Sequence, residues 1–155
     1  MNIKSARFAK LFPLVILLLI ALACPAFSED IKTLIKKAEA GDLDAQLNLG
    51  YAYYDGQGVP QNNHEAVKWF RKAAEQGNAK AQFNLGALYG NGQGVPQDYA
   101  LAYYWFSLSA SKMTGKEDYK RSAEARDKSA MKLTTDQLIK AQQMTRDFEA
   151  KHTRN

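Results

Sequence analysis

Few residues of this 155-residue chain have the type and spacing that chemistry requires. The chain has two histidines, His64 and His152, and one cysteine, Cys24. Neither histidine lies in the sequence beside an acid together with a serine or cysteine, as a nucleophilic site would need. A single cysteine excludes an intramolecular disulfide framework and a zinc site built from several thiolates. We therefore expect no catalytic residue, no metal site and no cofactor.

The motif GQGVPQ occurs twice, at residues 56–61 and 92–97. Its Gly-x-Gly pair lacks the lysine of a phosphate-binding loop, and the helix that follows does not begin in the register that such a loop needs. Glycine tolerates positive φ and proline fixes φ, so the motif predicts a turn. The acidic residues are scattered, and we expect them on solvated helix faces with pairs such as Glu117 with Arg121.

The net charge of +5 comes mainly from the first segment. Lys4, Arg7 and Lys10 are three of the 21 basic residues, and residues 1–28 contain no acid. The rest of the chain therefore has 18 basic residues against 16 acidic ones. This near balance argues against a nucleic-acid partner, which would require a concentrated basic face.

The charged start is followed by an apolar run that ends at Ala23 and then by small residues, the order of a secretory signal peptide. The apolar run is short and contains Pro13, so it is a poor membrane span. We expect no membrane span in the mature chain. Cleavage after Ser28 would leave a mature chain of residues 29–155 in the periplasm or outside the cell, and cleavage after Ala23 or Ala26 is an alternative. Cys24 either leaves with the signal or carries a lipid anchor, although the residues before it fit a lipoprotein signal only partly.

An internal repeat fills most of the remaining chain. Residues 38–73 and 74–109 align without gaps at a shift of 36, and 18 of the 36 positions are identical. In each copy two stretches with helical spacing of apolar residues flank the GQGVPQ turn, which predicts two helices per copy. Gly50 and Gly86 weaken the first helices, so we expect them to admit a closely packed neighbour. The second helices are predicted to bury Ala66, Trp69, Phe70 and Ala73, and Ala102, Trp105, Phe106 and Ser109.

Three shared motifs carry a resemblance: A-x-x-G-x-x-x-A-Q-x-N-L-G, Y-x-x-G-x-G-V-P-Q and A-x-x-W-F. With them the chain resembles the Sel-1-like repeat family, a relative of the tetratricopeptide repeats. The resemblance implies an all-α fold, an α/α solenoid of stacked antiparallel helix pairs. A stable stack needs about three units, so two full repeats require flanking helices.

The flanks contain such helices. Residues 30–40 place Leu34 where Phe70 and Phe106 stand in the copies, so this segment resembles the second helix of an incomplete earlier repeat. Residues 125–148 resemble the closing segment of many proteins of the family, and residues 116–151 are predicted to form two capping helices. Thr134 and Gln137 have the spacing of a capping box at the start of the last one. The sequence thus predicts seven helices after the signal.

The resemblance also implies a concave surface that binds a protein or peptide. Comparison with the tetratricopeptide repeats places these residues on it: Asp44, Leu47, Tyr51, Tyr54 and Asp55, and Lys80, Phe83, Ala87 and Asn91. Tyr51 and Tyr54 differ from their counterparts Ala87 and Gly90, whose small size would leave a pocket beside the tyrosines. The alternative is that both tyrosines pack on the N-terminal helix.

Tyr104 matches Lys68 in the first copy, so we expect it to be exposed, either as an outer-surface contact or as an isolated aromatic residue. The favoured function is an exported, periplasmic adaptor that is not an enzyme. A periplasmic immunity or inhibitor protein for a toxic enzyme is an alternative. A cell-wall-binding or β-lactam-hydrolysing protein is another, but the chain lacks the cysteine pairs of the family branch linked to β-lactams.

Overall fold

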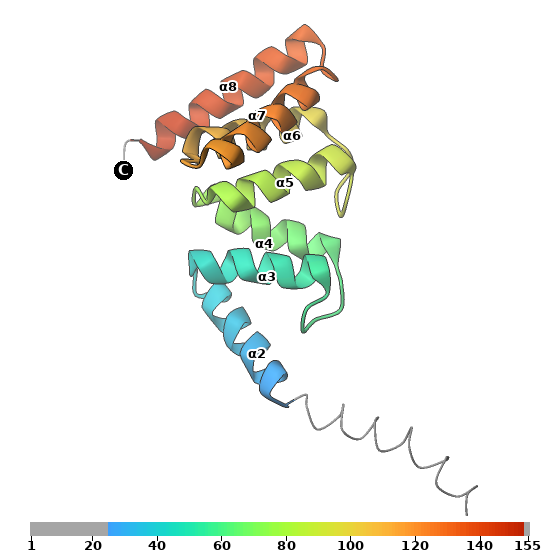
Figure 1. The fold of residues 1–155 in the computed structure, drawn as a ribbon, viewed down its shortest axis with the longest axis vertical. Helices are drawn as coiled ribbons and strands as arrows, with labels where there is room; N and C mark the ends of the chain where they lie inside the picture. The colour runs from blue at the N-terminus through green and yellow to red at the C-terminus, as the bar shows by residue number, and fades with distance from the viewer. Residues whose placement is uncertain (1–24, 154–155) are drawn as a thin grey trace, which may run out of the picture.

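The computed structural model describes residues 25–153, which form seven α-helices and no strand. Two antiparallel pairs make up the centre, α3 (Leu43–Asp55) with α4 (Asn63–Glu75) and α5 (Ala79–Asn91) with α6 (Tyr99–Lys112). Helix α2 (Pro25–Glu39) precedes them, and α7 (Lys116–Ala130) and α8 (Thr135–His152) follow. Helices α2 to α7 stack in chain order (Figure 1), which confirms the all-α solenoid.

The two pairs begin at the same places in their repeats. Asp42 and Asn78, 36 residues apart, are the N-caps of α3 and α5, and each side chain accepts the N–H three residues further on. Asn62 and Asp98 are likewise the N-caps of α4 and α6. Such caps satisfy backbone donors that a helix start leaves open, and each stabilises its helix by about 1 kcal/mol.

The GQGVPQ segments are turns, as predicted. Gly56 and Gly92 end α3 and α5 with φ of 73° and 68°, a left-handed conformation that glycine adopts without steric cost. Gln61 and Gln97 then donate their side-chain amides to the carbonyl seven residues earlier, at 2.8 Å in both copies. Each turn is therefore held to the end of the helix that it follows.

Gly50 and Gly86 permit close packing within each pair. A Cβ atom on Gly50 would lie 2.5 Å from the ring of Phe70, and one on Gly86 would lie 2.9 Å from the ring of Phe106. These are closer than side-chain carbons pack, so the phenylalanine of α4 or α6 occupies the space that the glycine leaves. The expectation of a closely packed neighbour is confirmed.

The core follows the predicted helix faces. All eight residues predicted for the second helices are buried. One cluster surrounds Phe70 and Phe106, and a second surrounds Leu49 and Trp69. Leu34 of α2 packs on the second cluster, as its match to Phe70 predicted. The helix before the first repeat therefore extends the core of the stack.

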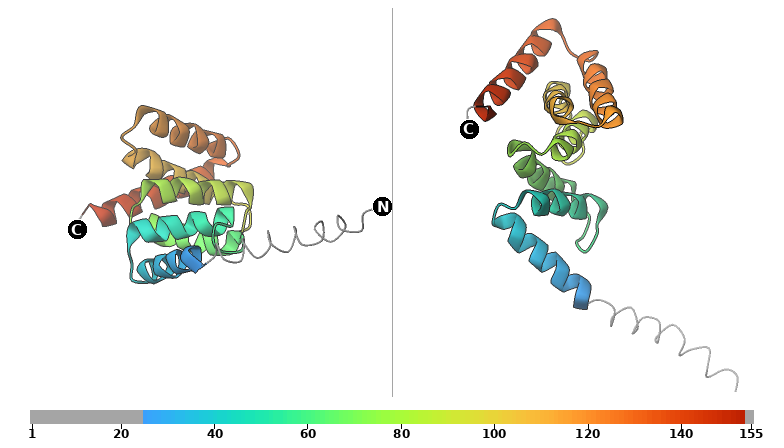
Figure 2. Two further views of the ribbon diagram at one scale, coloured as in Figure 1. Left: turned by 60° about the horizontal axis from the view of Figure 1, so that its bottom comes forward. Right: turned by 60° about the vertical axis from the view of Figure 1, so that its left-hand side comes forward.

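The last two helices close the stack by turning back. The Thr134 N–H donates to Gln137 Oε1 at 2.9 Å and the Gln137 N–H donates to Thr134 Oγ1 at 3.3 Å, which confirms the capping box. Helix α8 then packs on α6, and the right-hand view of Figure 2 shows α7 and α8 diverging from their shared turn. Buried hydroxyls of Ser109 and Ser122, 3.0 Å apart, join α6 to α7.

The predicted signal peptide lies outside the described residues, except that Pro25 to Ser28 form the first turn of α2. Cys24 also lies outside them. None of the helices in residues 25–153 combines the length and the apolar character that crossing a membrane demands.

Candidate binding surface

The first helices of the pairs, α3 and α5, and helix α7 line one side of the stack. Along α5, Lys80, Asn84, Ala87 and Asn91 are spaced by four, three and four residues, so they share one face of the helix. Three hollows lie along this stripe, and each is lined by at least one of its residues. We call this side, with its three hollows, the inner surface.

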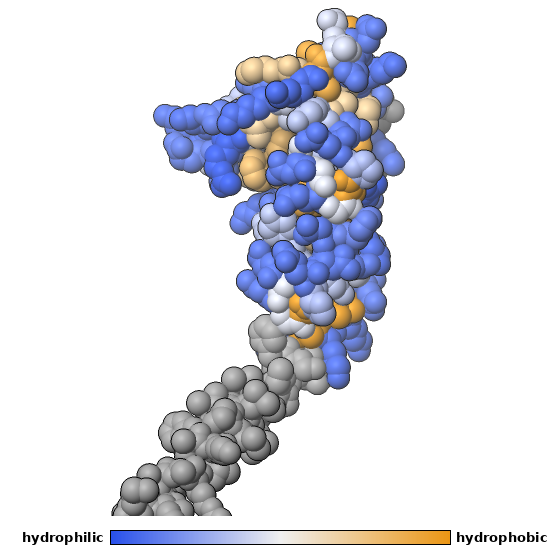
Figure 3. Space-filling model, turned by 90° about the vertical axis from the view of Figure 1, so that its right-hand side faces the viewer, coloured by the Kyte–Doolittle hydropathy of each residue, from blue (hydrophilic) through white to orange (hydrophobic). Residues whose placement is uncertain are grey.

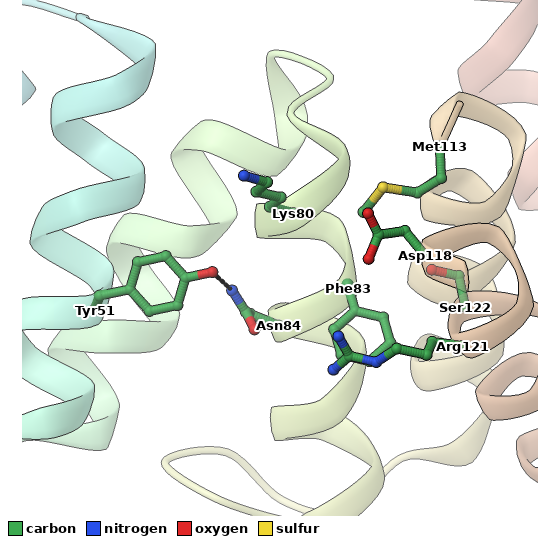
Figure 4. A pocket seen from close by; sticks show the side chains of 8 residues that line it. All are labelled: Tyr51, Lys80, Phe83, Asn84, Met113, Asp118, Arg121 and Ser122. Atoms are coloured by element: carbon green, nitrogen blue, oxygen red, sulfur yellow. Dashed lines mark hydrogen bonds between the residues drawn. The ribbon is translucent and has the colours of Figure 1, made fainter. Parts of the chain in front are cut away.

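The first hollow lies among α3, α5 and α7 and has a volume of about 240 Å³. Figure 4 shows Lys80, Phe83 and Asn84 on α5, with Tyr51 reaching across from α3. The opposite wall comes from the end of α6 and the start of α7, and its side chains are Met113, Asp118, Arg121 and Ser122. The hollow is therefore lined by both aromatic and charged side chains.

The second hollow, of about 170 Å³, shares Tyr51 and Asn84 with the first. Asn84 Nδ2 donates to the Tyr51 hydroxyl at 2.8 Å, and this bonded pair stands between the two hollows. The Tyr51 ring is held edge-on against Phe70 at a centroid distance of 5.2 Å. Tyr54 and Ala87 also line this hollow, so it offers mainly apolar surface.

The third hollow, of about 250 Å³, shares Ala87 and Asn91 with the second and extends between α5, α6 and α7. Gly90 lines this hollow and does not line the one beside the tyrosines. A fourth, of about 470 Å³, lies between α2 and α3 on the other side of Tyr51. Figure 3 shows the side of the molecule that lies on the right in Figure 1. Hydrophobic residues form separate patches there among hydrophilic ones.

Charged side chains border all three hollows of the inner surface. Lys80, Asp118 and Arg121 border the first hollow, Asp55 borders the second, and Lys128 and Lys132 border the third. The Arg121 guanidinium lies over the Phe83 ring, 5.1 Å from its centroid. The ion pair expected between Glu117 and Arg121 is absent from the ion pairs of the described residues. Arg121 is therefore held against an aromatic ring instead of a neighbouring acid.

The repeat unit observed here matches a known one. The family model described as Sel1 repeat matches residues 43–78 and 79–112, which are the two helix pairs. The chain contains two Sel1 repeats. Sel1 repeats typically mediate protein–protein interaction, and the family is generally a scaffold without enzymatic activity. The copies predicted at 38–73 and 74–109 have the same period but begin in the last turns of α2 and α4.

Solved structures agree with this assignment. A protective antigen from uropathogenic Escherichia coli strains, which displays an SLR fold, is 36% identical with a TM-score of 0.70 over 78% of this chain and 25% of that one. A Sel1 repeat protein from Oxalobacter formigenes is 45% identical with a TM-score of 0.51 over 52% of this chain and 61% of that one. This Sel1 chain thus spans a quarter of the first protein and less than two thirds of the second. No curated protein matched the sequence.

The residues predicted for the concave surface take different places in the Sel1 repeats. Seven of them line the hollows of the inner surface: Tyr51, Tyr54, Asp55, Lys80, Phe83, Ala87 and Asn91. Asp44 is exposed at the start of α3 and lines none of the hollows described above. Leu47 is only 8% exposed, because it packs in the core around Phe70. Tyr51 also borders the hollow next to α2, so it lies both on the inner surface and beside the N-terminal helix.

The expectation that Tyr104 is exposed is wrong. Its side chain is 8% exposed and packs on Trp105 and on Phe148 of α8, with centroid distances of 4.6 Å and 6.2 Å. Burial, with a smaller contribution from the charge of Glu75, raises the pKa of Tyr104 to about 12. Lys68 is exposed in the first repeat, where α4 packs mainly on α3 and α5, whereas α6 also packs extensively on α8. Tyr104 is therefore a core residue and cannot be an outer-surface contact.

Sequence reasoning missed Asn84 and Arg121. Asn84 lies in the Asn-Leu-Gly motif that both repeats share, and the candidate surface residues did not include it. Its spacing of four from Lys80 on a predicted helix was the available signal. Arg121 was missed because α7 was treated as a cap, whereas it provides one wall of the first hollow.

Proposed function

We propose that this Sel1 repeat protein is an adaptor that binds an extended segment of a protein partner along its inner surface. The observation that carries the proposal is the row of three adjoining hollows of about 170 to 250 Å³. Pockets for cofactors and drug-sized ligands are larger, roughly 300 to 1,000 Å³. Hollows of the smaller size suit single side chains of a bound chain, and rigid tyrosines at their edges are common in binding surfaces.

The positions of the histidines support binding over catalysis. His152 lies at the end of α8, where its ring stacks on Phe148 and approaches the carbonyl oxygen of Glu75. His64 lies in the first turn of α4 and borders a different hollow from those of the inner surface. Within residues 25–153 no three His, Cys, Asp or Glu side chains gather as a metal site requires. We therefore assign the inner surface to recognition.

We also propose that the chain is exported to the periplasm, on the basis of its N-terminal sequence. Fusion of residues 1–40 to an alkaline phosphatase that is active only after export tests this. The fusion should give active phosphatase, and replacing Leu17 and Leu18 by arginine in the apolar run should abolish it. Equal activity of both fusions, or none from either, would contradict export through this segment.

The binding proposal is tested with a library of random peptides displayed on phage. Purified residues 29–155 should select a limited family of sequences. Replacing Ala87 by Trp would fill the second hollow, so the selected peptides should bind this variant at least tenfold more weakly. Ala150→Trp on exposed α8 places the same side chain away from the hollows and should bind as well as the unmodified chain. Failure to select any peptide, or equal binding by both variants, would overturn the proposal.

A further inference from the structure

We propose that the first hollow receives an Asp or Glu side chain of the bound segment, held by Lys80 and Arg121. This inference rests on the proposed function and specifies the chemistry of the partner: an extended acidic segment with an apolar residue next to its acid. Lys80 comes from α5 and Arg121 from α7, and both side chains line the same hollow (Figure 4). Two cations from different helices thus border a space of about 240 Å³.

Both cations are available for a ligand. Among the ion pairs of the described side chains, none involves Lys80 or Arg121. Both residues are exposed, so neither pays a large desolvation cost while it waits for a partner. A carboxylate between them would gain two charge-assisted hydrogen bonds, which are stronger than bonds between neutral groups.

The stacking of Arg121 on Phe83 prepares it for a carboxylate. The guanidinium lies over the ring at 5.1 Å, and this contact restricts a long side chain that would otherwise move freely. An arginine held by its face keeps the N–H groups at its edge free, and these groups match the two oxygens of a carboxylate. The entropy lost on binding is therefore smaller than for an unrestrained side chain.

Asp118 is the acid that lines the same hollow, and its charge must be weighed against the two cations. It is the third residue of α7, and its Oδ2 atom lies 3.3 Å from where a Cβ on Gly115 would be. The carboxylate is thus close to the first turn of its own helix, whose dipole favours a negative charge there. Two cations against one acid, which its own helix also stabilises, leave the hollow complementary to an anion.

The neighbouring hollow explains why an apolar residue should accompany the acid. It is reached past the bonded pair of Tyr51 and Asn84 and is lined by Tyr54, Phe70 and Ala87. Asn84 uses its Nδ2 to bond Tyr51, and its Oδ1 accepts no hydrogen bond from the described residues. That oxygen is placed to accept a backbone N–H of the segment between its acidic and apolar side chains.

The experiment uses peptides selected from the displayed library, synthesised with acetylated and amidated ends, and measures affinity by fluorescence anisotropy. The selected family should contain an Asp or Glu beside an apolar residue. Replacing that acid by its amide should weaken binding about tenfold to a hundredfold, the loss of a charged hydrogen bond. Arg121→Met should weaken the acidic peptide similarly and leave the amide peptide unchanged. Lys80→Met should act in the same direction.

Lys120→Met is the matched control, since it removes one exposed charge from the same helix without lining the hollow. It should bind the acidic peptide as the unmodified chain does. Selected peptides that lack an acid, or equal loss from Arg121→Met and Lys120→Met, would overturn this inference while leaving the adaptor proposal intact. Binding that needs a free C-terminal carboxylate instead of a side chain would overturn it too. No selected peptide at all would remove the proposed function itself.

Discussion

The second helices of the two repeats, α4 and α6, each bury a tryptophan at the equivalent position. Different side chains cover the two rings. In α4, Trp69 is covered by Lys72, whose Nζ lies 4.3 Å from the ring centroid, and more distantly by Lys68. In α6, Trp105 is covered by Tyr104 and by Phe148 of α8. The two tryptophans are nevertheless 5% and 6% exposed.

The comparison separates what a repeat determines from what its neighbours determine. Long lysine side chains can cover an aromatic ring while their charges remain in water, so α4 needs no further helix. In α6, Tyr104 and Leu108 stand at the positions of Lys68 and Lys72, and α8 supplies the rest of the cover of Trp105. The packing of phenylalanine on glycine within each pair, Phe70 on Gly50 and Phe106 on Gly86, is alike in the two repeats. The cover of each tryptophan instead depends on where its repeat lies in the stack.

The largest expected effect tests whether the packing of phenylalanine on glycine is alike in the two repeats. Phe70→Ala and Phe106→Ala each remove a buried ring that packs on a glycine of the preceding helix. Each should lower the free energy of unfolding by about 3 to 5 kcal/mol, as other buried Phe→Ala changes do. Urea denaturation followed by circular dichroism measures both values. A loss below about 1 kcal/mol in one variant alone would show that the repeats do not share one core design.

The next effect tests the difference between the side chains that cover Trp69 and Trp105. Phe148→Ala uncovers Tyr104 and Trp105 and should cost about 2 kcal/mol, because Phe148 is only partly buried. Lys72→Ala, which uncovers Trp69, should cost less than about 1 kcal/mol, the size of an exposed cation–π contact. Met144→Ala on α8 is the control, since Met144 is 41% exposed. A cost for Lys72→Ala equal to that of Phe148→Ala would refute the proposed difference.

A pH effect of similar size is expected from Tyr104 of the second repeat. The pKa of Tyr104 is raised to about 12, so the folded protein keeps the phenol neutral where the unfolded chain has begun to ionise. The stabilisation is complete below about pH 10 and is lost as pH rises towards 12. The loss over this range should be about 2 kcal/mol.

The measurement is urea denaturation of the unmodified chain and of Tyr104→Phe at pH 9 and pH 11.5. Tyr104→Phe should lose less stability between these values than the unmodified chain. Tyr103→Phe leaves the buried phenol in place, so it should show the full loss. An identical pH dependence in all three proteins would mean that Tyr104 ionises as readily in the folded state as in the unfolded one.

The sequence predicted most of what the repeats share and little of what lies between distant segments. Turn glycines and the capping box act within a few residues, so the spacing of residues such as Thr134 and Gln137 was sufficient. The burial of Tyr104 depends on Phe148, 44 residues later, and no local pattern contains that contact. Arg121 could not be predicted as a site residue for the same reason, because α7 reaches the inner surface only in the folded stack.

The smallest expected effect compares the two glycines that admit the phenylalanines. Changing either glycine to alanine gains about 1 kcal/mol of helix propensity, while crowding in a packed core costs about 1 to 3 kcal/mol. The new Cβ would lie 2.5 Å from the Phe70 ring at position 50 but 2.9 Å from the Phe106 ring at position 86. Gly50→Ala should therefore lower the free energy of unfolding by about 1 kcal/mol, whereas Gly86→Ala should be close to neutral because helix propensity offsets a milder clash.

The urea midpoints of the two variants, compared at equal m-values, measure this difference. A larger loss of stability for Gly86→Ala would mean that Phe106 can shift less than Phe70. The packing of α8 on α6 would then also limit the packing of Phe106 on position 86.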